Sequence, residues 1–119
     1  MDFGQPAIIQ NLSPRTQERL GMSSDDVSIL CQRWGIRTMA IFGSILRDDF
    51  AEESDIDILL TFEPTARQGL LTLAKIKHEL EKQLHRTVDI TIKESVETSD
   101  NWIRRREILA TAQAIYEQR

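Results

Sequence analysis

The residues best suited to chemistry lie between two apolar runs near the middle of the chain. Gly43 and Ser44 follow the apolar run 36–42 directly. Backbone N–H groups at the start of such a turn or short helix are unpaired and can hold an anion such as phosphate. Glycine lets a phosphate approach the backbone closely, and the Ser44 hydroxyl can donate one more hydrogen bond. We therefore expect a phosphate-binding turn here.

A pair of carboxylates stands at the start of the second apolar run. Asp55 and Asp57 flank Ile56, so the alternation of a strand directs both carboxylates to one face and Ile56 to the core. Carboxylates this close repel each other unless a cation lies between them, and Mg²⁺ binds through a few carboxylates plus substrate phosphates. Asp89, in the alternating run 87–92, joins them if that strand lies beside the second. Three such carboxylates would suit a two-metal site.

The spacing of these residues resembles the nucleotidyltransferase signature of the DNA polymerase β superfamily. That signature is Gly-Ser, ten residues and Asp-x-Asp, and it stands here at Gly43, Ser44, Asp55 and Asp57. More narrowly, the short chain, an arginine three places after the serine (Arg47) and the later Val-Asp pair resemble the minimal nucleotidyltransferase (MNT) family. The resemblance covers residues 27–92.

The resemblance implies a mechanism and a partner. Members of this family are small antitoxins, usually encoded beside a helical HEPN ribonuclease toxin. Gly43, Ser44 and Arg47 would contact the phosphates of ATP, while Asp55, Asp57 and Asp89 would bind Mg²⁺. Asp89 would also draw the proton from the acceptor hydroxyl. AMP would pass to a tyrosine of the HEPN toxin, with release of pyrophosphate, and so neutralise it.

The sequence departs from the family pattern after Arg47. Family members commonly have a small residue there, whereas this chain has Asp48 and Asp49. Two roles therefore stay open for Arg47: a phosphate contact, or a surface ion pair with Asp48, Asp49 or Glu53.

The hydrophobic pattern predicts the elements that must position these groups. We expect, in order, a helix between Ser23 and Gly35, strands at 36–42 and 56–62, an amphipathic helix at 68–84, a strand at 87–92 and a helix at 101–117. Residues 1–22 are predicted to be an N-terminal arm, extended except for one helical turn at 16–20. Residues 23–119 are predicted to be a single α/β (α+β) domain of the nucleotidyltransferase fold, a small mixed sheet flanked by helices.

Composition narrows the function classes. The chain has 119 residues and a net charge of −4, so it is one domain, and direct nucleic-acid binding is not expected. Cys31 is the only cysteine, which excludes an intrachain disulfide and argues against structural zinc. The sequence has no apolar stretch of about 20 residues and no secretory signal pattern. We therefore expect a cytoplasmic protein without a membrane span.

Several residues outside the signature have more than one interpretation. Residues 104–106 are three arginines that could meet a triphosphate, an RNA or an acidic partner, or simply form a solvated helix face. Trp34 and Trp102 fit a core, whereas an exposed tryptophan would mark a partner site. Tyr116 could in principle accept AMP. Two rival functions also stay open: a non-catalytic antitoxin that masks its partner, and an enzyme acting on a small molecule or an RNA 3′ end.

Overall fold

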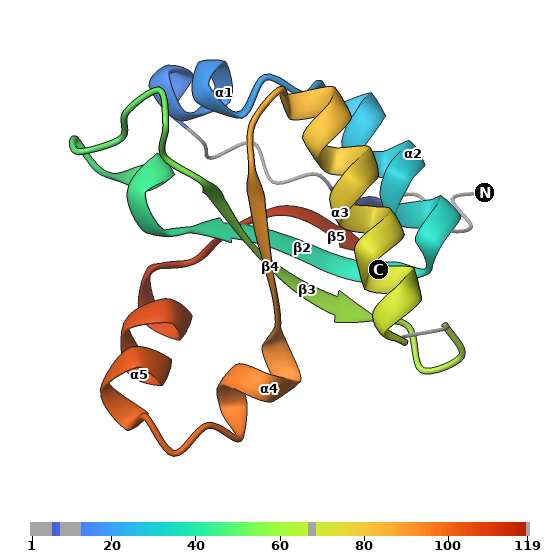
Figure 1. Cartoon of the computed structure of the whole chain (residues 1–119). Helices are drawn as coiled ribbons and strands as arrows, with labels where there is room; N and C mark the ends of the chain where they lie inside the picture. Colours follow the sequence, from blue (N-terminus) through green and yellow to red (C-terminus); the bar gives the residue numbers. More distant parts are fainter. Residues whose placement is uncertain (1–5, 8–12, 67–68, 119) are drawn as a thin grey trace.

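The protein is a mixed β-sheet with helices on both faces (Figure 1). The computed structural model describes residues 6–7, 13–66 and 69–118. Its elements are β1 (Pro6–Ala7), α1 (Pro14–Leu20), α2 (Ser24–Trp34), β2 (Ile36–Phe42), the 3₁₀ helix η1 (Gly43–Leu46), β3 (Ile56–Phe62), α3 (Leu70–Leu84), β4 (Val88–Ile92), α4 (Lys93–Glu97), α5 (Trp102–Thr111) and β5 (Gln113–Gln118). The strand order is β1-β5-β2-β3-β4, in which only β3 and β4 run parallel. The predicted fold class is confirmed.

Helix α2 and strand β2 form where the sequence pattern places them. The Ser23 side chain accepts a hydrogen bond from the backbone N–H of Asp26, and Gly35 ends the helix in the left-handed conformation at φ 69°. Val27 and Leu30 are buried beneath the helix. The observed bounds of β2 and β3 are those predicted.

The parallel pair β3 and β4 is joined by α3, which crosses over one face of the sheet. Ile56 and Ile58 belong to the larger core cluster on that face, together with buried residues of α2 and α3. The alternation of β3 therefore turns Asp57 and Leu59 to the opposite face, where Leu59 packs with Val96 of α4 and Ile108 of α5. Within the described residues, no helix is long and apolar enough to cross a membrane.

The prediction of one helix over 101–117 is wrong in its second half. Helix α5 ends at Thr111, Ala112 is extended, and Gln113–Gln118 form strand β5 between β1 and β2. Ile115 and Tyr116 are consecutive residues and both buried, as in a strand covered on both faces. The spacing of Ile108, Ala112 and Ile115 matches a helical period by coincidence, because Ile115 is buried as part of the sheet and not of a helix.

The N-terminal region is more ordered than an extended arm. Residues 14–20 form a helix of 7 residues rather than one turn, capped by Ser13, and Leu20 lies in the core. Strand β1 pairs with β5. Neither β1 nor α4 was predicted. The remainder of the predicted arm, residues 1–5 and 8–12, lies outside the described residues, and the division between an arm at 1–22 and a domain at 23–119 stays a prediction.

Candidate active site

A cavity of about 290 Å³ lies where the end of β2 and the starts of β3 and β4 meet α5. Its lining residues are Phe42, Gly43, Arg47, Asp57, Asp89, Arg104, Glu107, Ile108 and Thr111. Four of the six predicted site residues are among them, although they come from parts of the chain as far apart as residues 43 and 89. The fold thus assembles most of the predicted site in one place.

Gly43 is needed both for its backbone conformation and for its neighbour. Its φ is +79°, a region that side chains with a Cβ rarely adopt. A Cβ built there would lie 2.3 Å from Oδ2 of Asp57. The Asp57 carboxylate therefore sits against the glycine backbone at the start of η1, in the turn predicted to bind phosphate.

The carboxylates of β3 and β4 lie close enough to influence one another. Asp57 and Asp89 are direct partners in the register of the parallel pair, as expected if the two strands are neighbours. Partial burial, together with the charges of Asp89 and Asp55, raises the pKa of Asp57 above its ordinary value. Arg104 and Arg47 act in the opposite direction and lower this pKa. The cavity thus has a negative floor with cationic groups at its rim.

This donor set fits Mg²⁺ shared with a bound nucleotide better than a closed protein cage. Among the described residues, no group of three His, Cys, Asp or Glu side chains is placed to hold a metal ion by itself. Asp57 and Asp89 supply two adjacent carboxylates, and Mg²⁺ sites in proteins commonly consist of one or two carboxylates completed by substrate phosphates and water. The pKa of Asp57 is raised first by partial burial and then by repulsion from Asp89 and Asp55, and a bound cation would relieve that repulsion.

Both roles left open for Arg47 have a structural counterpart. Its side chain lines the cavity, and its Nε also donates to Oδ1 of Asp49 at 3.1 Å. That pair is exposed and lowers the pKa of Asp49. Exposed ion pairs are screened by water and contribute little to stability. Arg47 can therefore exchange Asp49 for a stronger anion at little cost.

Two predicted site residues do not line the cavity. Ser44 lies half-buried in η1, where its carbonyl oxygen accepts a hydrogen bond from the N–H of Arg47 at 2.9 Å. Asp55 is exposed and precedes the first residue of β3. Its connection to the site is electrostatic, through the pKa of Asp57.

Comparison with known proteins places this constellation in a family. The model of the nucleotidyltransferase domain matches residues 27–114, a span that contains the cavity and strands β2, β3 and β4. The chain belongs to the nucleotidyltransferase domain family.

Relatives of this nucleotidyltransferase agree in fold and in name. The protein adenylyltransferase MntA of Thermococcus cleftensis is 36% identical over 69 residues, which are 58% of this chain and 68% of that protein. A solved structure named as a minimal nucleotidyltransferase is 28% identical, with a TM-score of 0.61 over 88% of this chain and 98% of that one. A complex of tri-AMPylated Shewanella oneidensis HEPN toxin with MNT antitoxin matches at 13% identity and a TM-score of 0.55, over 86% of this chain and 72% of that one. At that identity the last match shows a shared fold only.

Helix α5 adds cavity residues that are not among the six predicted site residues. Arg104, Glu107 and Thr111 lie one helical turn apart and face the cavity of the nucleotidyltransferase. Arg105 instead donates to the carbonyl oxygens of Glu97 and Ser99. The run of arginines at 104–106 indicated a possible anion site, but the sequence did not show which arginine faces the cavity. The rotation of the helix about its axis decides this, and burial of Ile108 sets that rotation.

Proposed function

We propose that this nucleotidyltransferase is an antitoxin that transfers AMP from ATP to a hydroxyl, a tyrosine in our proposal, of a HEPN ribonuclease toxin and so neutralises it. The observation that carries this proposal is the cavity in which Asp57 and Asp89 stand opposite each other beside Gly43. The names of the relatives support it, since MntA is a protein adenylyltransferase and an MNT antitoxin has been solved with an AMPylated HEPN toxin.

The binding roles follow from charge and position. Gly43 and Ser44 at the start of η1 and Arg47 directly after its end contact the phosphates of ATP. Arg104, which lines the same cavity, is a second cation. Asp57 and Asp89 hold Mg²⁺, and Asp55 adds negative charge beside them. When bound, Mg²⁺ neutralises phosphate charge and orients the triphosphate.

The transfer itself asks little covalent chemistry of the protein. The acceptor hydroxyl oxygen attacks the α-phosphorus of ATP, its proton passes to the Asp89 carboxylate, and the bond to the leaving pyrophosphate breaks. The products are an AMP ester on the acceptor and pyrophosphate. Reactions of this kind depend on positioning and on stabilising the developing charge, which are the two things this cavity offers.

The surface around the cavity favours a protein acceptor over a small molecule. Trp102 and Ile103 are 58% and 62% exposed, and they begin the same helix that carries Arg104 into the cavity. Exposed aromatic and aliphatic side chains beside a site are typical of protein interfaces. Tyr116 is fully buried and unsuited to accept AMP from its own chain.

The proposal is tested by incubating the purified chain with its HEPN partner, Mg²⁺ and ATP labelled at the α- or the γ-phosphate. We expect the α-label, and not the γ-label, to appear on the partner protein. Label in RNA or in a small molecule instead would overturn the protein-acceptor assignment. Absence of any transfer from all four nucleotides, with a tight complex still forming, would favour the masking antitoxin.

A further inference from the structure

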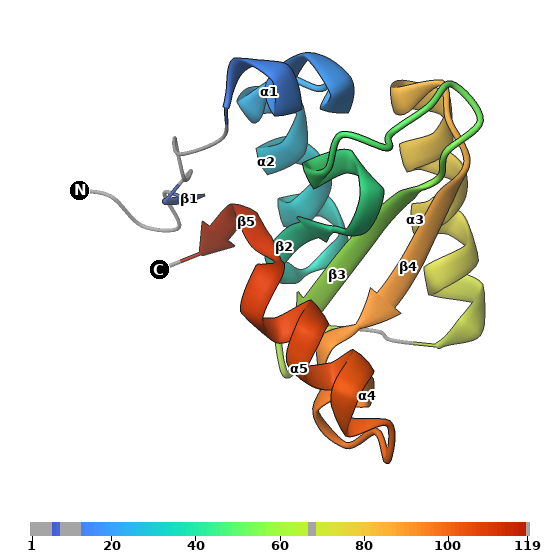
Figure 2. The same ribbon diagram turned by 90° about the vertical axis from the view of Figure 1, so that its left-hand side faces the viewer.

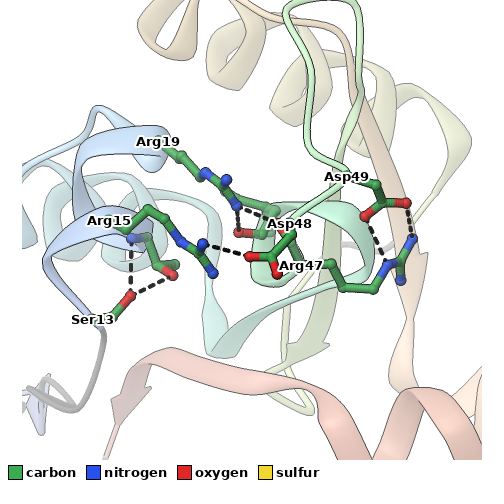
Figure 3. Close-up of polar contacts among 8 residues, drawn as sticks. Ser13, Arg15, Arg19, Arg47, Asp48 and Asp49 are labelled. Atoms are coloured by element: carbon green, nitrogen blue, oxygen red, sulfur yellow. Dashed lines mark hydrogen bonds and ion pairs between the residues drawn. The ribbon is translucent and has the colours of Figure 1, made fainter.

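The segment between Gly43 and the start of β3 contains only one short 3₁₀ helix, yet it carries the predicted phosphate contacts. Helix α1 lies beside η1 in both views (Figures 1 and 2). From α1, Nη1 of Arg19 donates to the carbonyl oxygens of Ile45 at 3.0 Å and Arg47 at 2.6 Å (Figure 3). One guanidinium therefore fixes two peptide groups on either side of Leu46.

A second arginine holds the rest of the same segment. Nη1 of Arg86, from the turn between α3 and β4, donates to the carbonyl oxygens of Ala51, Glu52 and Ser54 at 2.8 to 3.0 Å. The two guanidinium groups share one aromatic ring, since Phe50 lies 4.9 Å from Arg19 and 4.2 Å from Arg86. Such cation–π contacts add attraction that does not require a charged partner.

The contacts of Arg19 determine how the backbone of η1 is presented. A trans peptide unit is planar, with its C=O and N–H pointing in opposite directions. Carbonyl oxygens of residues 45 and 47 that face Arg19 therefore turn the N–H groups of Leu46 and Asp48 away from α1. Arg47, whose carbonyl oxygen accepts one of these bonds, also lines the cavity.

We propose that α1 is a positioning element for the nucleotide site and that Arg19 is its positioning residue, setting η1 and Arg47 in the orientation that receives the triphosphate. This inference rests on the proposed function, because it assumes that the cavity binds ATP. Helix α1 lies outside residues 27–114, which the family model matches.

The test compares Arg19→Gln with Arg15→Gln, a matched loss of charge on the same helix. Among the described residues, Arg15 pairs with the exposed carboxylate of Asp48 at 2.6 Å. We expect Arg19→Gln to raise the KM for Mg·ATP about 10-fold, because small misplacements of binding groups cost up to about 100-fold. Arg15→Gln should leave KM unchanged. Arg19→Lys, which keeps the charge but not the planar fork, should fall between Arg19→Gln and wild type.

A second readout needs no nucleotide. Amide hydrogen exchange should become faster in residues 44–50 of Arg19→Gln, with β3 and β4 unchanged. Wild-type exchange in this segment together with a wild-type KM would overturn the proposal, as would general acceleration through the sheet. If the wild-type chain itself binds no ATP, the proposed function fails. In that case, faster exchange in Arg19→Gln that is confined to residues 44–50 would still establish that Arg19 orders the segment. Unchanged exchange in those residues would refute the ordering role of Arg19 too.

Discussion

Asp57 is the residue on which most observations converge. It pairs with Asp89 across the parallel strands, its Oδ2 lies against Gly43, and the charges of Asp55 and Asp89 help to raise its pKa. Such an arrangement is unfavourable for an isolated protein and favourable for one that binds a cation. Partial burial and carboxylate repulsion disfavour the charged form of Asp57 in the free protein, and the proposed Mg²⁺ would relieve the repulsion.

Replacing Asp57 should therefore separate stability from activity. Because its pKa is higher in the folded than in the unfolded chain, the folded chain holds more protons between those two values, and the free energy of unfolding falls as pH rises through that window. Asp57→Asn should remove this decline and raise Tm at neutral pH without metal, while lowering AMP transfer about 100-fold or more. Thermal melts with and without Mg²⁺ provide the measurement. A Tm increase on adding Mg²⁺ that is equal in both proteins would contradict the assignment.

Gly43 allows a test with an internal control. Gly21 has a similar φ of +72°, but a Cβ there would meet nothing within 4 Å. Gly21→Ala should cost only the backbone strain, roughly 1 to 2 kcal/mol. Gly43→Ala should cost more, because its Cβ also displaces Asp57, and it alone should abolish AMP transfer. Denaturant melts and activity assays of both variants suffice, and equal losses of stability and activity would count against the contact.

At the scale of elements, the sequence predicted what depends on local pattern. Strands 36–42 and 56–62 were located correctly because apolar runs and a following glycine or proline mark them. The position of Asp89 was predicted only on the condition that its strand lies beside the second, and the pairing of β3 with β4 fulfils that condition. Strand β5 was predicted as helix because residues 108, 112 and 115 match a helical period. Only pairing with β2, a long-range interaction, makes these residues a strand.

Local sequence pattern also does not distinguish the three consecutive arginines of α5, because their different surroundings depend on tertiary contacts. Arg104→Gln should weaken ATP binding about 10-fold, since a hydrogen bond to a charged group contributes about 1.5 to 3 kcal/mol. Arg105→Gln should instead lower Tm, because it loses the carbonyls of Glu97 and Ser99, and leave ATP affinity unchanged. Calorimetric titration without partner, alongside Arg106→Gln as a control on the exposed side of the helix, distinguishes them. Equal effects of Arg104→Gln and Arg106→Gln would place Arg104 outside the site.

At the scale of the whole molecule, the cavity is built from several elements that are distant in the sequence. Its floor comes from the sheet, one wall from η1, which α1 supports, and the other wall from α5. The exposed apolar residues Trp102 and Ile103 at the start of α5 directly precede Arg104, which lines the cavity, so they offer a surface on which an acceptor protein could dock.

Substitution of Trp102 by Ala should weaken the complex with the HEPN partner without weakening ATP binding. An interface aromatic of this kind contributes about 2 kcal/mol, near 30-fold in Kd. Leu71 is a matched control, since it is 70% exposed but lies on α3, on the other face of the sheet. Affinities measured by surface-immobilised partner should change for Trp102→Ala only. Comparable losses in the two variants would move the docking surface elsewhere.

We propose that Asp57 and Asp89 catalyse modification of a HEPN partner rather than merely dock it. The most direct measurement is the intact mass of the HEPN partner after co-expression with the wild type, with Asp57→Asn and with Asp89→Asn. Our account predicts a partner carrying added AMP with the wild type, and an unmodified, still toxic partner with either variant even where the complex forms. A partner that is neutralised without any added mass, or modified equally by all three proteins, would contradict it.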